Sequence, residues 1–170
     1  MEKARLMNES LIKDFRLQRP KIAVLGINPH CGDKGVIGNE DDEVLRPALK
    51  KLYFDENILV FGPFAADSFF GSQTYRNYDA ILAPYHDQGL IAFKTIAFGS
   101  GVNYTAGLSK VRTSPDHGTA YEIAGKGIAE PESFRHAIYT ALDVFRNREE
   151  YAELTKNPLK VRTLEADKDK

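Results

Sequence analysis

Three of the four histidines stand where a folded chain could use them for chemistry. His30, His86 and His117 each follow an apolar run and lie in a short polar segment, whereas His136 lies inside a helical pattern and is expected to be a surface or packing residue. In a parallel sheet, such segments fall at the carboxyl ends of strands, where α/β folds build their ligand sites. A neutral imidazole there can bind a divalent metal or exchange a proton.

His30 lies in a glycine-rich segment, GINPHCGDKGVIG. The Asn-Pro pair favours a turn, and the glycines permit positive φ angles and a close approach of the backbone to a ligand. The segment matches neither the dinucleotide-binding fingerprint nor the phosphate loop of nucleotide hydrolases. The alternative interpretation is a flexible connection in which the histidine is incidental.

His86 lies in LAPYHDQG, where an apolar run gives way abruptly to His-Asp-Gln. The neighbouring Asp87 could orient the imidazole or accept a proton. Asp67, in GPFAADSFF, is a second acid at an expected strand-to-helix transition, and its alternative role is that of a helix N-cap. Two histidines from separate strand ends do not make a metal site, because a third ligand would be needed.

A third set of candidates could bind an anion. Lys94, Asn103 and Arg112 are spread through FKTIAFGSGVNYTAGLSKVRTS. Two cations and an amide donor could hold a phosphate or a carboxylate, and Arg112 could do so with two parallel hydrogen bonds. Taken one at a time, each has the alternative interpretation of a solvated surface residue.

The segment TSPDHGTAYEIAGKG places turn-forming residues before His117 and Gly118, and a helical pattern over 118–125 follows. Backbone N–H groups at such a helix start can receive a pyrophosphate or an adenine edge. The competing interpretation is that Ser114 or Asp116 serves as an ordinary helix cap.

Strand-like and helical patterns alternate along the chain. The strand-like runs lie at 21–28, 58–62 and 78–85, and helical patterns lie at 8–17, 48–54, 65–71, 86–94, 118–125 and 132–151. An acidic cluster at 40–43 suits the start of the second of these helices, because acids are favoured at helix N-termini. The alternation predicts an α/β fold, layered α-β-α, with a mostly parallel sheet.

The last of these helices is strongly amphipathic. Its apolar stripe is made by Phe134, Ile138, Ala141, Leu142 and Phe145. We expect one α/β domain over residues 1–155, followed by a charged, frayed tail over 156–170.

Composition narrows the class of protein. The 170 residues carry 23 Lys and Arg against 24 Asp and Glu, a net charge of −1, which argues against a binder of nucleic acid or of anionic membranes. Cys31 is the only cysteine, so intrachain disulfides and thiolate zinc clusters are excluded. No stretch approaches the 18 apolar residues of a membrane span, and we expect a cytoplasmic location.

Five ordered segments within residues 21–130 together resemble one family, the PdxA family, which comprises the 4-hydroxythreonine-4-phosphate dehydrogenases of pyridoxal phosphate biosynthesis. The segments are NPHCGDKGVIGNED, GPFAADSFF, YHDQGLIAFK, GVNYTAGL and RTSPDHGTAYEIAGKG. The resemblance covers nearly the whole chain but only the C-terminal half of a family member. It implies an α/β fold related to isocitrate and isopropylmalate dehydrogenases.

The resemblance also implies roles for individual residues. Two of the family's three metal-binding histidines match His30 and His86, and the third lies upstream of the matching region. The family's substrate-binding residues match Lys94, Asn103 and Arg112. The segment that lines the adenine side of NAD(P) in the related dehydrogenases matches His117, Gly118, Thr119 and Ala120. Asp67 and Asp87 match acidic positions that we take as candidate catalytic groups. Modest departures from the family pattern occur at Cys31, Asp33 and Ser109.

The implied activity is an NAD(P)-dependent oxidation of 4-hydroxythreonine 4-phosphate assisted by a divalent metal (Zn, Mg or Co). Decarboxylation to 3-amino-2-oxopropyl phosphate would follow. Family members are homodimers with sites at the subunit interface, so self-association is expected. Two alternatives stay open: a paralogue acting on erythronate or threonate phosphate, and a non-catalytic fragment that binds metal or cofactor.

Overall fold

The computed structural model describes residues 1–97 and 99–159. The helices are α1 (Glu2–Lys13), α2 (Arg46–Phe54), α3 (Ala66–Gly71), α4 (His86–Ile96) and α5 (Glu132–Thr155). The strands are β1 (Ile22–Leu25), β2 (Val60–Phe64), β3 (Ala80–Leu82), β4 (Val102–Tyr104) and β5 (Thr113–Pro115). Short helical turns lie at Pro29–Gly35, Asp41–Leu45, Thr74–Asn77 and Tyr121–Ile123.

Strands β1, β2 and β3 form a parallel sheet in the order β2-β1-β3. Ile22 of the central strand pairs with Val60 on one side and with Ala80 on the other. All four residues of β1 are buried, which explains why the sequence shows a continuous apolar run there instead of alternation. The parallel sheet predicted from the sequence is confirmed for these three strands.

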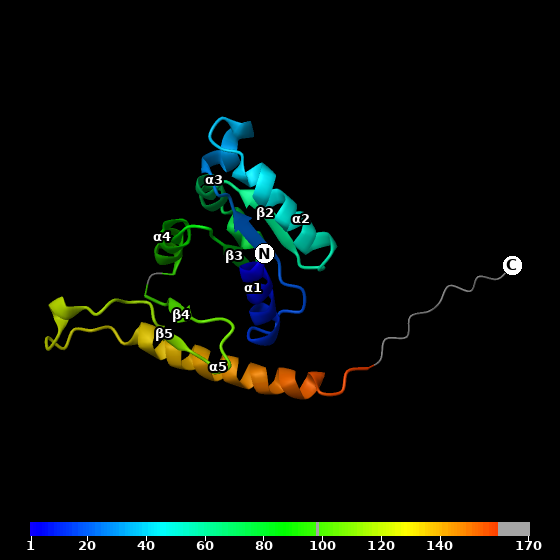
Figure 1. Ribbon diagram of the computed structural model, residues 1–170. Helices are drawn as coiled ribbons and strands as arrows, with labels where there is room; N and C mark the ends of the chain where they lie inside the picture. Colours follow the sequence, from blue (N-terminus) through cyan, green and yellow to red (C-terminus); the bar gives the residue numbers. More distant parts are fainter. Residues whose placement is uncertain (98, 160–170) are drawn as a thin grey trace.

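Alternate residues of β1 point into two apolar clusters on opposite faces of the sheet. Ile22 and Val24 pack with residues of α1 and α2, whereas Ala23 and Leu25 pack with Phe69 of α3. Helices therefore cover both faces of the central strand (Figure 1). Each large side chain buried in this way contributes about 1.5–3 kcal/mol to folding.

The second half of the chain adds a smaller layer. Strands β4 and β5 pair antiparallel, with Asn103 opposite Ser114. Helix α5 lies along this two-stranded sheet (Figure 1) and buries Ser133, Ala137 and Val144 against it and its surroundings. The hydroxyl of Thr113 on β5 donates to the carbonyl oxygen of Ala137 at 2.8 Å.

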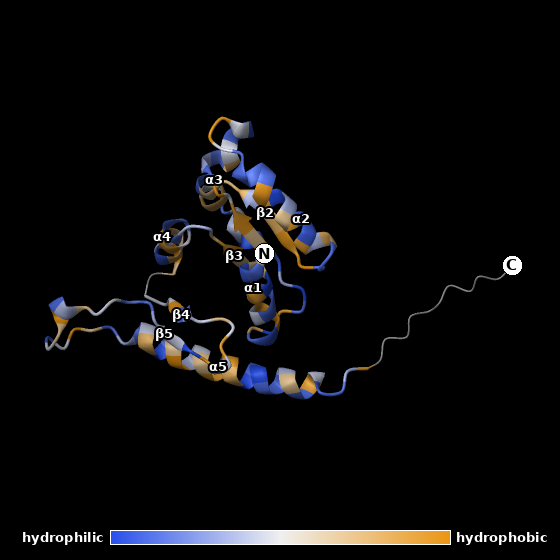
Figure 2. Cartoon of the chain, viewed as in Figure 1, coloured by the Kyte–Doolittle hydropathy of each residue, from blue (hydrophilic) through white to orange (hydrophobic). Residues whose placement is uncertain are grey.

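The apolar stripe of α5 does not face the core. Phe134, Ile138, Leu142 and Phe145 remain 45–58% exposed, and hydrophobic and hydrophilic positions alternate along the helix in Figure 2. Small side chains such as Ser133 and Ala137 let the helix approach the narrow sheet, so the bulky residues are turned away from it. The sequence thus located the stripe correctly but did not reveal which face was covered.

Two expected helices differ from the observed ones. The helix expected over 118–125 is reduced to the turn Tyr121–Ile123, because Ala120 and Gly125 adopt positive φ angles of 49° and 75° on either side of it. The helix expected at 8–17 is α1, which begins earlier and ends at Lys13. Residues 160–170 of the expected tail lie outside the described residues. Within the described ranges, no helix is long and apolar enough to cross a bilayer.

A buried ion pair ties the two parts of the fold together. Asp14, directly after α1, is 2% exposed and receives hydrogen bonds from Arg148 of α5, the shortest at 2.6 Å. The Tyr104 hydroxyl on β4 also donates to this carboxylate. Burial alone would raise the pKa of Asp14, but hydrogen bonds from Arg148 and Tyr104 outweigh it, and the pKa lies below its ordinary value.

Replacing Asp14 by Asn is expected to lower the free energy of unfolding by about 3 kcal/mol, because Arg148 is left without its buried counter-charge. The depressed pKa means that this contribution is present above the unfolded pKa of about 4 and is lost as the pH falls through the lower folded value. Urea unfolding between pH 2 and pH 7 measures both effects. Glu132→Gln, which removes an exposed pair with Arg135, is the matched control and is expected to cost less than about 1 kcal/mol. Equal losses in the two variants would contradict the prediction.

Candidate functional site

The parallel sheet gathers the predicted site residues at one edge. Because β1, β2 and β3 run in the same direction, their carboxyl ends lie together, and His30, Asp67 and His86 each follow one of these ends. The three residues come from segments that are far apart in the sequence. This placement follows from strand direction alone.

A buried carboxylate fixes the start of the His30 loop. Asp41 is fully buried, and its two oxygens accept hydrogen bonds from the backbone N–H groups of Ile27 and Asn28, both at 2.8 Å. The side-chain amide of Asn28 donates in turn to Glu40 at 2.8 Å. The acidic cluster therefore does more than begin a helix: Asp41 anchors the loop that carries His30.

A second anchor joins β1 to the first turn of α4. The side-chain amide of Gln88 donates to the carbonyl oxygen of Gly26, at the end of β1, at 2.9 Å. The oxygen of the same amide accepts from the backbone N–H of Tyr85 at 3.3 Å. Gln88 thus holds the turn that presents His86 against the loop that leads to His30.

The backbone around His30 is held in a left-handed turn. The two residues on either side of Gly32 all have φ angles between 43° and 54°; they are His30, Cys31, Asp33 and Lys34. Each such residue costs about 1–2 kcal/mol relative to a right-handed conformation. Strain of this kind persists where the surroundings over-determine the backbone, and it concentrates at functional sites. The hydrogen bonds made by Asp41 lie directly at the base of this turn.

Asp67 borders two neighbouring cavities at the sheet edge. One, of about 430 Å³, is also lined by Asn28, His30, Tyr85 and Gln88. The other, of about 530 Å³, is shared by Asp67, Asp87 and Gln88 and continues along the α4 side chains Ile91 and Thr95. The side chain of Asp67 lies in the first turn of α3 without capping it, so the N-cap alternative is not supported.

His86 and Asp87 form an exposed pair at the start of α4. Nδ1 of His86 lies 2.8 Å from a carboxylate oxygen of Asp87, and both side chains are about 80% exposed. His86 does not line the cavity that contains His30. In the part of the chain that the structure describes, no three His, Cys, Asp or Glu side chains are arranged to hold a metal ion. These residues by themselves therefore do not complete a metal site.

Cys31, beside His30, does not act as an additional thiolate. Burial raises the pKa of its thiol, and the carboxylate of Asp41 raises it further. The thiol therefore stays protonated at neutral pH, consistent with a packing role next to Gly26.

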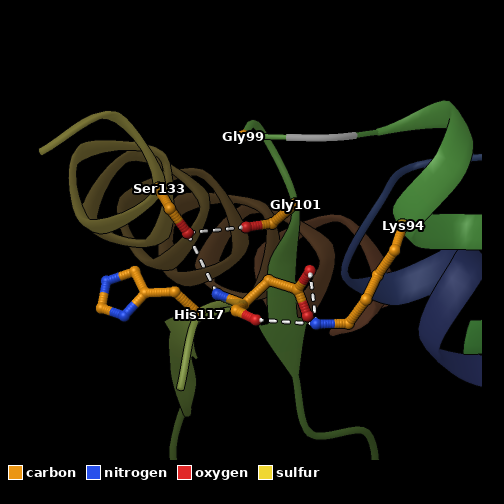
Figure 3. Close-up of a pocket in the computed structure, with 6 residues that line it drawn as sticks. Lys94, Gly99, Gly101, His117 and Ser133 are labelled. Atoms are coloured by element: carbon orange, nitrogen blue, oxygen red, sulfur yellow. Dashed lines mark hydrogen bonds and ion pairs between the residues drawn. The ribbon is translucent and has the colours of Figure 1, made fainter. Parts of the chain in front are cut away.

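A separate cavity of about 240 Å³ brings two of the predicted sets together (Figure 3). Lys94 of the predicted anion site and His117 of the predicted cofactor segment both line it, with Gly99, Gly101, Asp116 and Ser133. Nζ of Lys94 donates to the carbonyl oxygen of Asp116 at 3.4 Å and lies 3.8 Å from its carboxylate. The structure thus pairs this lysine with an acid that sequence reasoning considered only as a helix cap.

The other predicted binding residues lie outside this cavity. Asn103 is exposed on β4, and Arg112, before β5, donates to the hydroxyl of Thr105 at 2.8 Å. Gly118 and Thr119 are exposed in the segment after β5. Because no α-helix begins there, the expected set of N–H groups at a helix start is absent from residues 118–125.

Sequence reasoning missed the residues that position the site. Asp41 and Gln88 were visible only as members of polar runs, and Ser133 carried no signal because a serine at a helix start is common. Asp116 could have been noticed from its place beside His117. Their roles depend on partners 13 to 62 residues away, which local patterns do not reveal.

Comparison with known proteins gives a consistent result. The family model described as "Pyridoxal phosphate biosynthetic protein PdxA" matches residues 1–141. The chain is 54% identical over 159 residues to 4-hydroxythreonine-4-phosphate dehydrogenase of Bacteroides thetaiotaomicron, covering 94% of this chain and 43% of the relative. It is 54% identical over 142 residues to the protein of the same name from Prosthecochloris aestuarii, covering 84% and 41%. The chain thus spans about two fifths of the length of these relatives.

Solved structures give the same picture. A crystal structure of 4-hydroxythreonine-4-phosphate dehydrogenase from Klebsiella pneumoniae superposes with a TM-score of 0.70 at 39% identity, covering 83% of this chain and 42% of that one. A terephthalate 1,2-cis-dihydrodiol dehydrogenase from Burkholderia xenovorans superposes with a TM-score of 0.61 at 32% identity, covering 81% and 43%.

Replacing Asp41 by Asn is expected to loosen the His30 loop, because an amide offers one acceptor oxygen where two N–H donors must be satisfied. The loss is expected to be about 2 kcal/mol of unfolding free energy, with faster hydrogen exchange at the amides of Ile27 and Asn28. Asp42→Asn, which removes an exposed pair with Arg46, is the matched control and is expected to cost about 0.5 kcal/mol. Unchanged exchange at both amides in Asp41→Asn would contradict the anchoring role.

Proposed function

The chain belongs to the PdxA family, and from this premise we propose that it forms part of a 4-hydroxythreonine-4-phosphate dehydrogenase. The reaction would oxidise the C3 hydroxyl of 4-hydroxythreonine 4-phosphate. The resulting β-keto acid would then lose carbon dioxide to give 3-amino-2-oxopropyl phosphate, a step of pyridoxal phosphate biosynthesis in the cytoplasm. The observation that carries the proposal is the family match, which runs through every loop at the site edge of the sheet.

We propose that His30 and His86 are two ligands of a divalent metal whose third ligand comes from outside this chain. Both residues stand at carboxyl ends of neighbouring parallel strands, and the described residues supply no complete set of three. When bound, the metal would polarise the hydroxyl being oxidised, and NAD(P) would accept the hydride. Asp87 would orient His86 through their 2.8 Å contact. Asp67, which borders the His30 cavity, would be placed to take a proton.

Substrate and cofactor would be bound by the second half of the chain. Lys94, Asn103 and Arg112 would bind the anionic groups of the substrate, with two positive charges to offset those of the phosphate and carboxylate. The segment His117–Ala120 would line the adenine side of NAD(P). The position of Lys94 and His117 on one cavity supports a meeting of substrate and cofactor there.

Two alternatives rest on specific observations. A paralogue that oxidises erythronate or threonate phosphate is supported by the similar fold of a protein named for a dihydrodiol, because proteins of this fold are thus named for more than one hydroxyl-bearing substrate. A non-catalytic chain that binds metal or cofactor is favoured by the described residues, which hold no complete set of three metal ligands.

We further propose that the protein is a homodimer with its site at the subunit interface. The exposed stripe of α5, Phe134, Ile138, Leu142 and Phe145, supports a partner surface, because monomers rarely expose so many large apolar side chains in a row. The stripe would also suit the part of a family member that this chain lacks.

The catalytic proposal is tested by following NAD(P)H formation from 4-hydroxythreonine 4-phosphate, with the full protein that carries this chain. His86→Ala is expected to lower both turnover and bound zinc by more than about 100-fold, because it removes a ligand from a set of three. His136→Ala, at an exposed position of α5, is the matched control and is expected to retain both. Normal zinc content and rate in His86→Ala would refute the ligand role.

The dimer proposal is tested by sedimentation of the same protein. Replacing Ile138 and Leu142 together by Glu is expected to shift it towards monomer, since four charges would be buried in an apolar contact. Replacing the exposed Arg135 and Arg146 by Glu is the control for added charge on the same helix. A dimer that survives the Ile138 and Leu142 changes would place the interface elsewhere.

A further inference from the structure

The cavity of Lys94 presents opposite charges side by side. The Lys94 side chain, from α4, is about half exposed, and the Asp116 side chain, directly after β5, is 26% exposed. The ammonium of Lys94 lies 3.8 Å from the Asp116 carboxylate and 3.4 Å from its backbone carbonyl oxygen. Figure 3 shows the Lys94 side chain extending from α4 towards the other residues that line the cavity. An ammonium has three N–H donors, so these two contacts leave a donor of Lys94 for a ligand.

The position of Asp116 is built into the fold and is not that of a loose surface acid. The buried hydroxyl of Ser133 accepts from the backbone N–H of Asp116 at 3.0 Å and donates to the carbonyl oxygen of Gly101 at 3.1 Å. A Cβ atom at Gly101 would lie 2.7 Å from the Phe93 ring and 3.1 Å from the Asp116 carboxylate. Glycine at this position therefore lets the carboxylate sit close to β4, facing Lys94.

We propose that Asp116 determines substrate specificity by binding the ammonium group of an amino-bearing substrate, while Lys94 binds the adjacent anion. This inference rests on the proposed function, in which Lys94 binds the phosphate or carboxylate of the substrate. The four charges would then alternate in sign around the cavity: the Asp116 carboxylate, the Lys94 ammonium, the substrate anion and the substrate ammonium. Each charge would have an opposite charge on both sides.

The same arrangement disfavours a substrate that lacks an amine. Erythronate and threonate phosphates would bring the same carboxylate and phosphate near the Asp116 carboxylate, but without the ammonium that offsets these negative charges. In a partly buried cavity such repulsion is stronger than at an open surface, because water screens it less. Asp116 thus discriminates between the amino-bearing substrate and the two hydroxy acids, which are similar in size and carry the same phosphate group.

The test compares KM for 4-hydroxythreonine 4-phosphate with KM for threonate 4-phosphate, in the full protein supplied with metal and NAD(P). We expect the wild-type protein to favour the amino compound by about tenfold or more, the range of a charge-assisted hydrogen bond. Asp116→Asn is expected to raise KM for the amino compound by about 10- to 100-fold and to leave KM for threonate phosphate equal or lower. Asp116→Glu, which keeps the charge, is expected to retain a preference for the amino compound.

Ser133→Ala is the control for position. It loosens the backbone of Asp116 but keeps the carboxylate, so it is expected to raise KM for the amino compound less than Asp116→Asn does and to retain a preference for that compound. Equal increases of KM for both compounds in Asp116→Asn would overturn the inference and leave Asp116 as a support for Lys94 only. Equal KM values for the two compounds in the wild-type protein would also overturn the inference. This outcome does not depend on whether a variant folds. A wild-type protein that oxidises neither compound would instead refute the proposed function, and the inference with it.

Discussion

The site depends on the burial of one short strand between two parallel neighbours. Because β1 pairs with β2 and β3 in the same direction, the loops that follow these three strands all begin at the same edge of the sheet, although they are remote in sequence. The hydrogen bonds from Ile27 and Asn28 to the fully buried Asp41 then convert the end of β1 into a fixed starting point for the His30 turn. Without this carboxylate, two N–H groups at the base of a strained turn would lose their hydrogen-bond partners. These contacts would then no longer hold the turn in its left-handed backbone conformation.

The rest of the candidate site is held to this edge by polar contacts between distant elements. Gln88 connects α4 to the end of β1, and Asp14 connects α1 to α5 through Arg148. The Lys94 and Asp116 pair connects α4 to the end of β5. The last two contacts join helices on the side of the three-stranded sheet to the smaller layer formed by β4, β5 and α5, whereas the Gln88 contact fixes α4 to the sheet itself. These polar contacts therefore fix the two layers relative to one another.

The sequence revealed what depends on local pattern. The continuous apolar run at 21–28 predicted a buried parallel strand, and the helical pattern at 48–54 predicted α2, which begins two residues earlier at Arg46. The family resemblance of the loops was readable for the same reason, since it depends on residue types in order along the chain. The metal and substrate roles of the matched residues stay predictions.

What the sequence could not reveal depends on partners far along the chain. The stripe of α5 is equally apolar whether it is covered or exposed, and only the packing of Ser133 and Ala137 on β4 and β5 decides the matter. Likewise, the helix expected over 118–125 has adequate local propensity, but positive φ angles at Ala120 and Gly125 confine it to one turn. Asp41 looked like one of several acids at a helix start, and its burial sets it apart.

Helix α4 sets the distance between the two parts of the candidate site. His86 stands at its first residue and Lys94 eight positions later, so at a rise of 1.5 Å per residue their Cα atoms are separated by about 12 Å along the helix axis. A single rigid element therefore fixes the distance between the end that would face the metal and the end that would face the substrate anion. Since Gln88 holds the first turn of this helix and Asp116 contacts its last, neither end can shift without breaking a contact to a different layer. A substrate that spans these two ends would be selected by length through the helix and by charge through Asp116.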